Sequence, residues 1–123
     1  MKLKPKVFVV DDESVIALTL AAILRRSGFE AESFTVPAEA LKAAESGHPQ
    51  LLISDVMMPE LSGVELAILM RASCPDCEIL LFSGQAATAD LLKEARGKGY
   101  DFKLLQKPIH PTDLLMEIRL LEA

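Results

Sequence analysis

The sequence predicts an α/β fold in which helices cover a parallel sheet, and two observations support this. Short, continuously apolar runs alternate along the chain with longer stretches whose apolar residues recur at helical spacing. The short runs do not alternate apolar with polar residues, as expected for strands covered on both faces. Because each parallel crossover needs a covering helix, five strands alternating with five helices indicate a (βα)5 architecture.

Three strands are strongly indicated by their composition, and two more by their position between helices. The strong strands are Val7–Val10, Leu51–Ile53 and Ile79–Phe82. Weaker strands fit near residues 30 to 34 and 102 to 106. All five lie at the positions that an alternating chain requires.

The first two helices carry clear start or stop signals. The apolar stripe of the first consists of Ile16, Leu20, Ile23 and Leu24. Gly28 can end this helix. The second helix runs from about Pro37, a favoured first-turn residue, to Gly47, which can adopt the left-handed closing conformation.

The last three helices are each predicted from one apolar stripe. They lie near residues 63 to 73, at about 87 to 97, and from Pro111 or Thr112 onwards. Pro75 follows the third helix, and Gly97 or Gly99 can stop the fourth. The expected stripes are Leu66, Leu69 and Met70, then Ala87, Leu91 and Ala95, then Leu114, Ile118 and Leu121.

Length and composition predict one domain over residues 1–123, with an ordered core at about 6–121 and no output domain in this chain. The formal charge of −5 without a basic run argues against direct binding to nucleic acid or to an anionic membrane. No apolar stretch approaches the roughly 20 residues that cross a bilayer, and the first residues lack a signal peptide's apolar core. We therefore expect a cytoplasmic protein.

Cys74 and Cys77 form a C-P-D-C unit with the spacing of a redox or metal half-site. Thioredoxin-type chemistry places the first cysteine at a helix start after a strand, whereas this pair follows a helix and precedes a strand. Zinc would need two further ligands, and the histidines available are His48 and His110, each beside a proline. The pair is interpreted as a plain connecting loop.

Polar residues follow the predicted strands at the edge where parallel sheets bind ligands. Three acids, Asp11, Asp12 and Asp55, follow the first and third strands, Ser83 ends the fourth, and Lys107 follows the fifth. Carboxylates held close together repel, and a divalent cation bound by oxygens relieves that repulsion. Three carboxylates and one lysine leave a charge of −2, which one Mg²⁺ neutralises.

This order of residues resembles the receiver domain of two-component response regulators. The family places an acidic pair after the first strand, Asp after the third, Ser or Thr after the fourth, and Lys-Pro after the fifth. The stretch from Asp55 to Gly63 also matches the family's D-x-x-x-P-x-x-x-G pattern. The resemblance covers essentially the whole chain. It implies a doubly wound, three-layer sandwich of the flavodoxin or CheY type, with strand order 2-1-3-4-5.

The resemblance also implies a metal site and its cofactor, Mg²⁺. Asp12 and Asp55 would bind the ion directly and Asp11 through water. The backbone carbonyl of Met57 would complete the protein ligands. No cofactor other than the metal ion is implied.

By the same resemblance, Asp55 is the phosphoacceptor that becomes an aspartyl phosphate. Lys107 would pair with Asp55 and then with the phosphoryl oxygens. Ser83 would hydrogen-bond the phosphoryl group. The donor would be a sensor histidine kinase or a phosphotransfer protein, so the chain would catalyse its own phosphorylation and dephosphorylation rather than act as an enzyme on other substrates.

Phosphorylation would shift a surface formed by the fourth helix, fifth strand and fifth helix, which controls an unknown output partner or forms a homodimer. The family commonly has Tyr or Phe three residues before the lysine, but position 104 is Leu. Phe102 would share its face, because side chains on a strand repeat every two residues. Leu104 favours the alternative function, a non-phosphorylated pseudo-receiver interaction module. An aspartate-nucleophile phosphatase fits less well, since it would need a D-x-D motif after the first strand.

Overall fold

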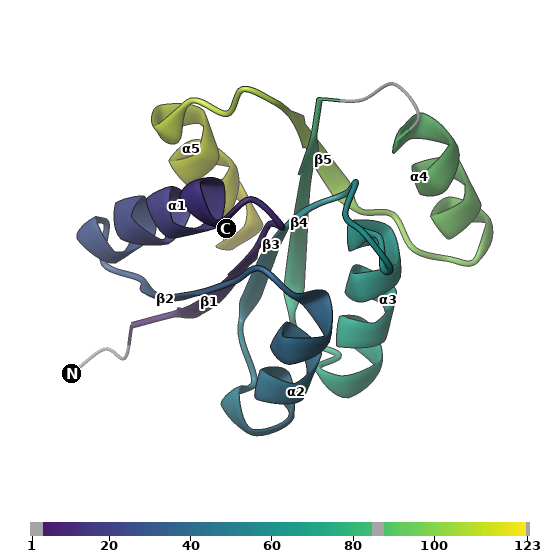
Figure 1. Cartoon of the computed structure of the whole chain (residues 1–123), viewed down its shortest axis with the longest axis horizontal. Coiled ribbons are helices and arrows are strands. Elements are labelled where there is room, and N and C mark those ends of the chain that lie inside the picture. Colours follow the sequence, from purple (N-terminus) through teal and green to yellow (C-terminus); the bar gives the residue numbers. More distant parts are fainter. Residues whose placement is uncertain (1–3, 85–87, 123) are drawn as a thin grey trace.

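The computed structural model describes residues 4–84 and 88–122 as a five-stranded parallel sheet between two layers of helices (Figure 1). The strand order is β2-β1-β3-β4-β5, which confirms the predicted doubly wound topology. The strands are β1 (Lys6–Val10), β2 (Glu30–Phe34), β3 (Leu51–Asp55), β4 (Glu78–Ser83) and β5 (Lys103–Gln106). The helices are α1 (Ser14–Arg26), α2 (Pro37–Gly47), α3 (Gly63–Ser73), α4 (Thr88–Gly97) and α5 (Pro111–Glu122).

The central strands are buried along almost their whole length, which explains why their sequences are continuously apolar. Every residue of β3 is buried, and in β4 only Glu78, at its start, is exposed. The outermost strands differ, because β2 and β5 each have exposed residues at the edges of the sheet. Their weaker sequence signal therefore reflects their position at the edges.

Helices cover both faces of the sheet (Figure 1). An apolar core lies beneath each layer. On one face, α1 and α5 bury Leu20, Leu24, Leu114 and Ile118 against the strands. On the other face, α2, α3 and α4 bury residues that include Ala44, Leu66, Met70 and Ala95. Burying apolar area on both faces is the main favourable term that holds the three layers together.

Three details of the predicted helices are wrong. In α1 the buried face is made by Ala17, Leu20, Ala21 and Leu24. Ile16 packs half-buried against this core, in agreement with the predicted stripe, whereas Ile23 is half-buried and does not belong to the core cluster. In α3, Leu69 was expected on the buried face but is 46% exposed. Ala67 lies on the buried face instead, together with Leu66 and Met70. In α2, the left-handed closing residue is His48, with φ of 45°, and not Gly47. Ala87 lies outside the described residues.

The cysteine turn between α3 and β4 is part of the core. Cys74 and Cys77 are free thiols, and both are buried against the face covered by α2, α3 and α4. The amide of Cys77 donates to the carbonyl of Cys74 at 3.0 Å, which closes the turn. Burial raises the pKa of the Cys74 thiol and raises that of Cys77 to about 12. The connecting loop is confirmed, and its cysteines additionally serve as apolar packing residues.

The loop between β3 and α3 brings the start of α3 against the end of β3. Ser62 caps the helix by accepting from the amide of Glu65, and the Glu65 carboxylate accepts from the amide of Ser62. The amide of Gly63 donates to the carbonyl of Val56 at 2.8 Å. A Cβ on Gly63 would overlap the backbone oxygen of Asp55 and lie 2.9 Å from the Cα of Val56. Only glycine fits at this contact.

Among residues 4–84 and 88–122, no helix combines the length and the apolar character that a membrane span requires.

We predict that Gly63→Ala lowers the free energy of unfolding by about 3 kcal/mol, because the new methyl group can be placed only by moving backbone. Urea unfolding followed by circular dichroism measures the change. Gly97→Ala is the matched control, since a Cβ at Gly97 meets nothing within 4 Å. The control should be unchanged or more stable by up to about 1 kcal/mol. Equal stability of the two variants would contradict the packing argument.

Candidate functional site

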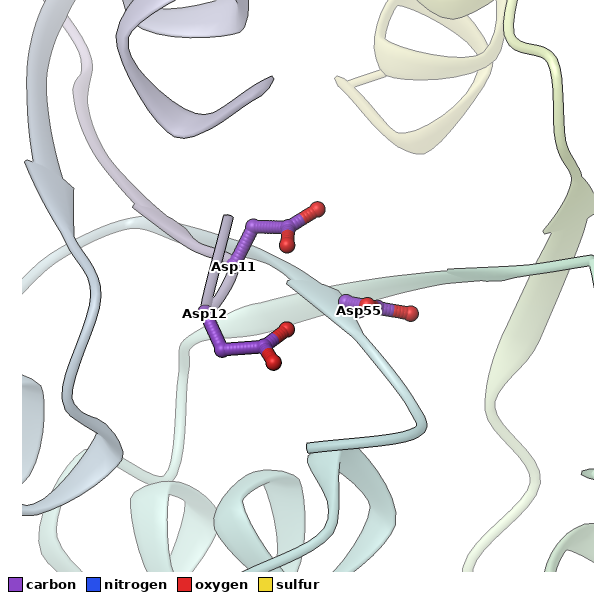
Figure 2. Close-up of side chains that lie close together, drawn as sticks. All are labelled: Asp11, Asp12 and Asp55. Carbon is purple, nitrogen blue, oxygen red and sulfur yellow. The ribbon is translucent and has the colours of Figure 1, made fainter. Parts of the chain in front are cut away.

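Acidic side chains converge at the carboxyl edge of the sheet. Asp11 and Asp12 follow β1, and Asp55 is the last residue of β3, the strand that pairs with β1. Figure 2 shows the three carboxylates extending to the same side of these strand ends. One carboxylate oxygen from each residue lies within 4.8 Å of the others. Residues more than 40 positions apart in the chain thus form one cluster.

The three carboxylates differ in their access to solvent. Asp11 is fully buried, Asp55 is 6% exposed, and Asp12 is exposed. The cluster therefore has a buried floor and one open side. A group that arrives from solvent meets Asp12 first and finds Asp55 behind it.

Lys107, which follows β5, supplies the positive charge of the site. Its Nζ lies 3.3 Å from Oδ2 of Asp55 and 3.5 Å from Oδ2 of Asp11. Its ammonium group also lies 5.1 Å from the ring centroid of Phe82. The expected pairing with Asp55 is present, and the contact with Asp11 is an addition that the sequence did not suggest. One lysine thus bridges the two buried acids.

Backbone amides help to hold the buried carboxylates. The amide of Glu13 donates to Oδ1 of Asp11 at 2.9 Å. The amide of Met57 donates to the carboxylate of Asp55. Each hydrogen bond favours the ionised form of the acid that accepts it. These amides belong to the loops that follow β1 and β3, so the strand ends themselves orient the acids.

Burial nevertheless raises the pKa of both acids. For Asp11, loss of solvent outweighs the amide of Glu13, and repulsion from Asp55 adds to the increase. For Asp55, loss of solvent outweighs the attraction of Lys107. Burial lowers the pKa of Lys107, but the two carboxylates outweigh this and the net direction is upward. The lysine is therefore well paired, whereas the acids carry more negative charge than one lysine offsets.

The donor set suits a small, hard divalent cation. Carboxylate oxygens with room for water on the open side are the ligands that Mg²⁺ prefers, and its charge would relieve the repulsion between the acids. Asp11, Asp12 and Asp55 are the one group of metal-binding side chains of this kind within residues 4–84 and 88–122. His48, Cys74 and Cys77 do not form a second one there.

Ser83 ends its strand, and Met57 lies in the loop just after β3, as expected. Ser83 is the last residue of β4 and is 4% exposed. Its carbonyl accepts from the amide of Lys107 at 3.1 Å, so β4 positions the backbone of the lysine. Met57 follows Asp55 by two residues, and 36% of its surface is exposed. Both residues therefore border the acidic cluster.

Gly63 is the positioning residue whose role sequence reasoning missed. The D-x-x-x-P-x-x-x-G pattern marked it, but the pattern did not say why a glycine stands there. The structure supplies the reason, since Gly63 contacts the backbone of Asp55 itself. Ser54 acts on the same segment by donating from Oγ to the Asp55 carbonyl at 2.9 Å. These contacts orient the strand end that carries the central acid.

Position 104 is occupied by a half-buried leucine that packs on the same core as Phe102. Phe102 is 8% exposed and stacks on Tyr100, with ring centroids 5.7 Å apart. The guanidinium of Arg71 lies 5.8 Å from the centroid of Phe102. The aromatic side chains near β5 are thus held between α3 and the chain that precedes the strand, away from the acidic cluster.

The family model of the response regulator receiver domain matches residues 7–119. The chain belongs to this family. Transcriptional regulatory protein PrrA of Mycobacterium tuberculosis is 32% identical over 117 residues, which are 95% of this chain and 49% of that protein. Response regulator receiver protein CpdR of Brucella abortus is 31% identical over 113 residues, which are 92% of each chain.

Solved structures of other proteins have the same fold. Chemotaxis protein CheY4 of Vibrio cholerae superposes with a TM-score of 0.84 at 27% identity, over 96% of this chain and 98% of that one. A protein from Neptuniibacter caesariensis gives a TM-score of 0.85 at 32% identity, over 97% and 88%. The chain spans about half the length of the PrrA proteins that it matches. This chain is therefore a receiver domain of two-component signalling.

We predict that Asp55→Asn makes the metal-free domain more stable at neutral pH. The pKa of Asp55 is raised above its ordinary value of 3.8, so its ionised form costs stability above the folded pKa. The gain should shrink as the pH falls towards 3.8, because wild-type Asp55 is then protonated. The urea unfolding midpoints of the wild type and the variant, taken between neutral pH and pH 3.8, measure this gain in stability. Asp101→Asn, at an exposed aspartate, is the control. A less stable Asp55→Asn would mean that the attraction of Lys107 outweighs burial.

Proposed function

We propose that this receiver domain is a phosphoacceptor in which Asp55 takes a phosphoryl group from a phosphohistidine. An oxygen of Asp55 forms the new P–O bond as the N–P bond of the donor breaks, and the electron pair stays on the donor imidazole. The observation that carries the proposal is the position of Asp55, 6% exposed beside two other acids and 3.3 Å from Lys107. The open side at Asp12 is the approach for the donor.

Phosphoryl transfer depends on in-line positioning and on neutralising the charge of the transferred group. Mg²⁺, when bound, would supply positive charge next to the phosphoryl oxygens and would lower the repulsion that the acids feel. Asp12 and Asp55 would hold it directly, Asp11 through a water molecule, and the Met57 carbonyl would be the fourth protein contact. Three carboxylates within 4.8 Å support this assignment.

Lys107 would hold Asp55 before the reaction and the phosphoryl oxygens after it. Its Nζ already lies between Asp55 and Asp11, so only a small movement of a flexible side chain is needed. Ser83 would donate its hydroxyl hydrogen to a phosphoryl oxygen, and it ends the strand next to the one that carries Asp55. The negative charge of the phosphoryl group would then be stabilised by the ammonium group of Lys107 and by the hydroxyl group of Ser83.

The partners follow from the family. Its relatives include transcriptional regulatory proteins, in which the receiver domain accounts for about half of the length. A sensor histidine kinase or a phosphotransfer protein would be the donor. The residues 1–123 would act as one receiver unit, and α4, β5 and α5 would form the surface that an output partner reads.

A second function, a non-phosphorylated interaction module, is favoured by one observation. Leu104 stands where the family commonly has an aromatic residue, and the nearby Phe102 is held between Tyr100 and Arg71. Such a module would keep the fold and the acidic cluster without accepting a phosphoryl group. The experiment on Asp55 decides between the two functions.

We expect an adduct of ~80 Da when the wild-type domain is incubated with Mg²⁺ and acetyl phosphate, read by intact-protein mass spectrometry. Asp55→Ala should not gain it, whereas Asp101→Ala, which removes an exposed aspartate elsewhere, should gain it like the wild type. Chelating the metal ion should abolish the adduct. An unmodified wild type, or an adduct that survives in Asp55→Ala, would rule out the proposed function.

Lys107→Ala should slow formation of the adduct by about 100-fold, the usual effect of removing one preorganised charge from a reacting group. Lys103→Ala is the matched control, because Lys103 lies on β5 but pairs with Glu117 at 3.5 Å on the surface. Its rate should equal that of the wild type. Rates are taken from the early time course of the mass shift. A Lys107→Ala rate within a few-fold of wild type would contradict the assigned role.

A further inference from the structure

The outer face of α1 is apolar although it is exposed. Val15 is 74% exposed and Leu18 is 58% exposed. Thr19 and Ala22 continue the same exposed stripe, at spacings of one helical turn. The inner face of α1 is already buried on the sheet. A helix that is apolar on both faces is typical of one covered on both sides.

An apolar groove lies beside this stripe. It has a volume of about 490 Å³ and runs between α1 and the segment that follows β5. Ile16 and Ile23 line one wall, Ile109 lines the other, and Phe82 and Lys107 contribute at the end near the acidic cluster. Both Ile16 and Ile23 are half-buried and line this groove. The stripe and the groove form one apolar surface, which we name the α1 face.

The distribution of charge along α1 indicates what covers the α1 face. Asp12 and Glu13 precede the helix, Arg25 and Arg26 end it, and no acidic or basic residue lies between them. The two ends therefore carry opposite charges. A second copy of the same helix, packed antiparallel, presents the complementary pattern.

The register of such a pair follows from the stripe. A twofold axis between Leu18 and Thr19 places Val15 opposite Ala22 of the partner subunit. The same axis places Arg25 opposite Asp12 of the partner subunit. Apolar residues then meet apolar residues along the centre, and opposite charges meet at both ends. Both contacts occur twice, as an isologous interface requires.

The outer face of α5 fits a second copy less well. Met116 and Leu120 are exposed there, but the groove beside them is also lined by Asp113 and Glu117. In a symmetric pair these acids would face a surface of the same sign, which disfavours association. The α1 face has no acid between Ser14 and Arg26.

We propose that the receiver domain self-associates through the α1 face as an antiparallel, twofold dimer. The α1 face adjoins Lys107, so association would narrow the approach to the acidic cluster and bring Arg25 and Arg26 of one subunit to the acidic end of the other. One pair of helix faces is smaller than the ~800 Å² per partner of a standard interface. The dimer is therefore weak, with dissociation in the micromolar range or above.

Sedimentation equilibrium of the whole domain over a wide concentration range tests the proposal. The wild type should convert from monomer to dimer as its concentration rises. Leu18→Glu should raise the dissociation constant at least 10-fold, because a charge is buried in the apolar centre. Leu120→Glu is the matched control, since Leu120 is 67% exposed on α5, and it should dimerise like the wild type. A monomeric wild type, or dimerisation lost in Leu120→Glu and kept in Leu18→Glu, overturns the proposal.

A charge exchange tests the antiparallel register. Arg25→Glu should weaken the dimer, and the double variant with Asp12→Arg should recover it, because the register places these two residues opposite each other. Within one chain these residues lie about 20 Å apart along α1, so recovery can arise only between subunits. No recovery overturns the register. Adduct formation by Leu18→Glu at dilute concentration reports folding and the Asp55 chemistry separately, so the two proposals fail independently.

Discussion

Crowding of three carboxylates at the end of a parallel sheet is the constraint on which this domain depends. Asp11, Asp12 and Asp55 lie within 4.8 Å of one another, and burial raises the pKa of the two that are covered. A structure that only needed to fold would place apolar side chains here. The fold instead offsets part of the repulsion between the acids with one lysine and two backbone amides, and it leaves one side open. The unbalanced charge makes the site chemically suited to a divalent cation.

The backbone that follows Asp55 adopts an unusual conformation that holds the end of β3 in place. Glu60 has a φ of 68°, and the amide of Leu61 donates to the carbonyl of Pro59 at 2.7 Å across a three-residue turn. This tight turn returns the chain so that Gly63 can contact the end of β3. A non-glycine residue in that conformation is strained, and strain of this kind persists where surrounding contacts hold it. The end of β3 is thus fixed by the loop after it as much as by the sheet.

The sequence predicted the fold and the convergence of the acids and Lys107, because both follow from local signals combined with the order of the strands. Continuously apolar runs located β1, β3 and β4, and the helix ranges matched within a few residues. The acids and Lys107 were found because parallel strands end at a common edge, so the order of residues in the chain determines their proximity.

What the sequence could not predict depends on contacts between distant segments. Leu69 and Ala67 lie two positions apart on one helix, and only the packing of α3 decides that Ala67 is buried. The bridge from Lys107 to Asp11 needs the three-dimensional separation of side chains that are far apart in the chain. The left-handed closing conformation was assigned to Gly47 on the usual preference for glycine. Gly47 is instead the last helical residue, with the ring of Phe8 close to it, and the left-handed conformation falls on His48.

The buried cysteine turn has a consequence for measurement. Both thiols are covered and stay protonated, so a reagent that reacts with thiolates can reach them only when the corner between α3 and β4 opens. Arg71 ties this corner to the residue that precedes β5, because it donates to the carbonyl of Cys77 at 2.8 Å while lying over Phe102 on the same face of the sheet. The rate of thiol labelling therefore reports how often the layer of α2, α3 and α4 separates from the strands. The domain contains its own native probe of local opening.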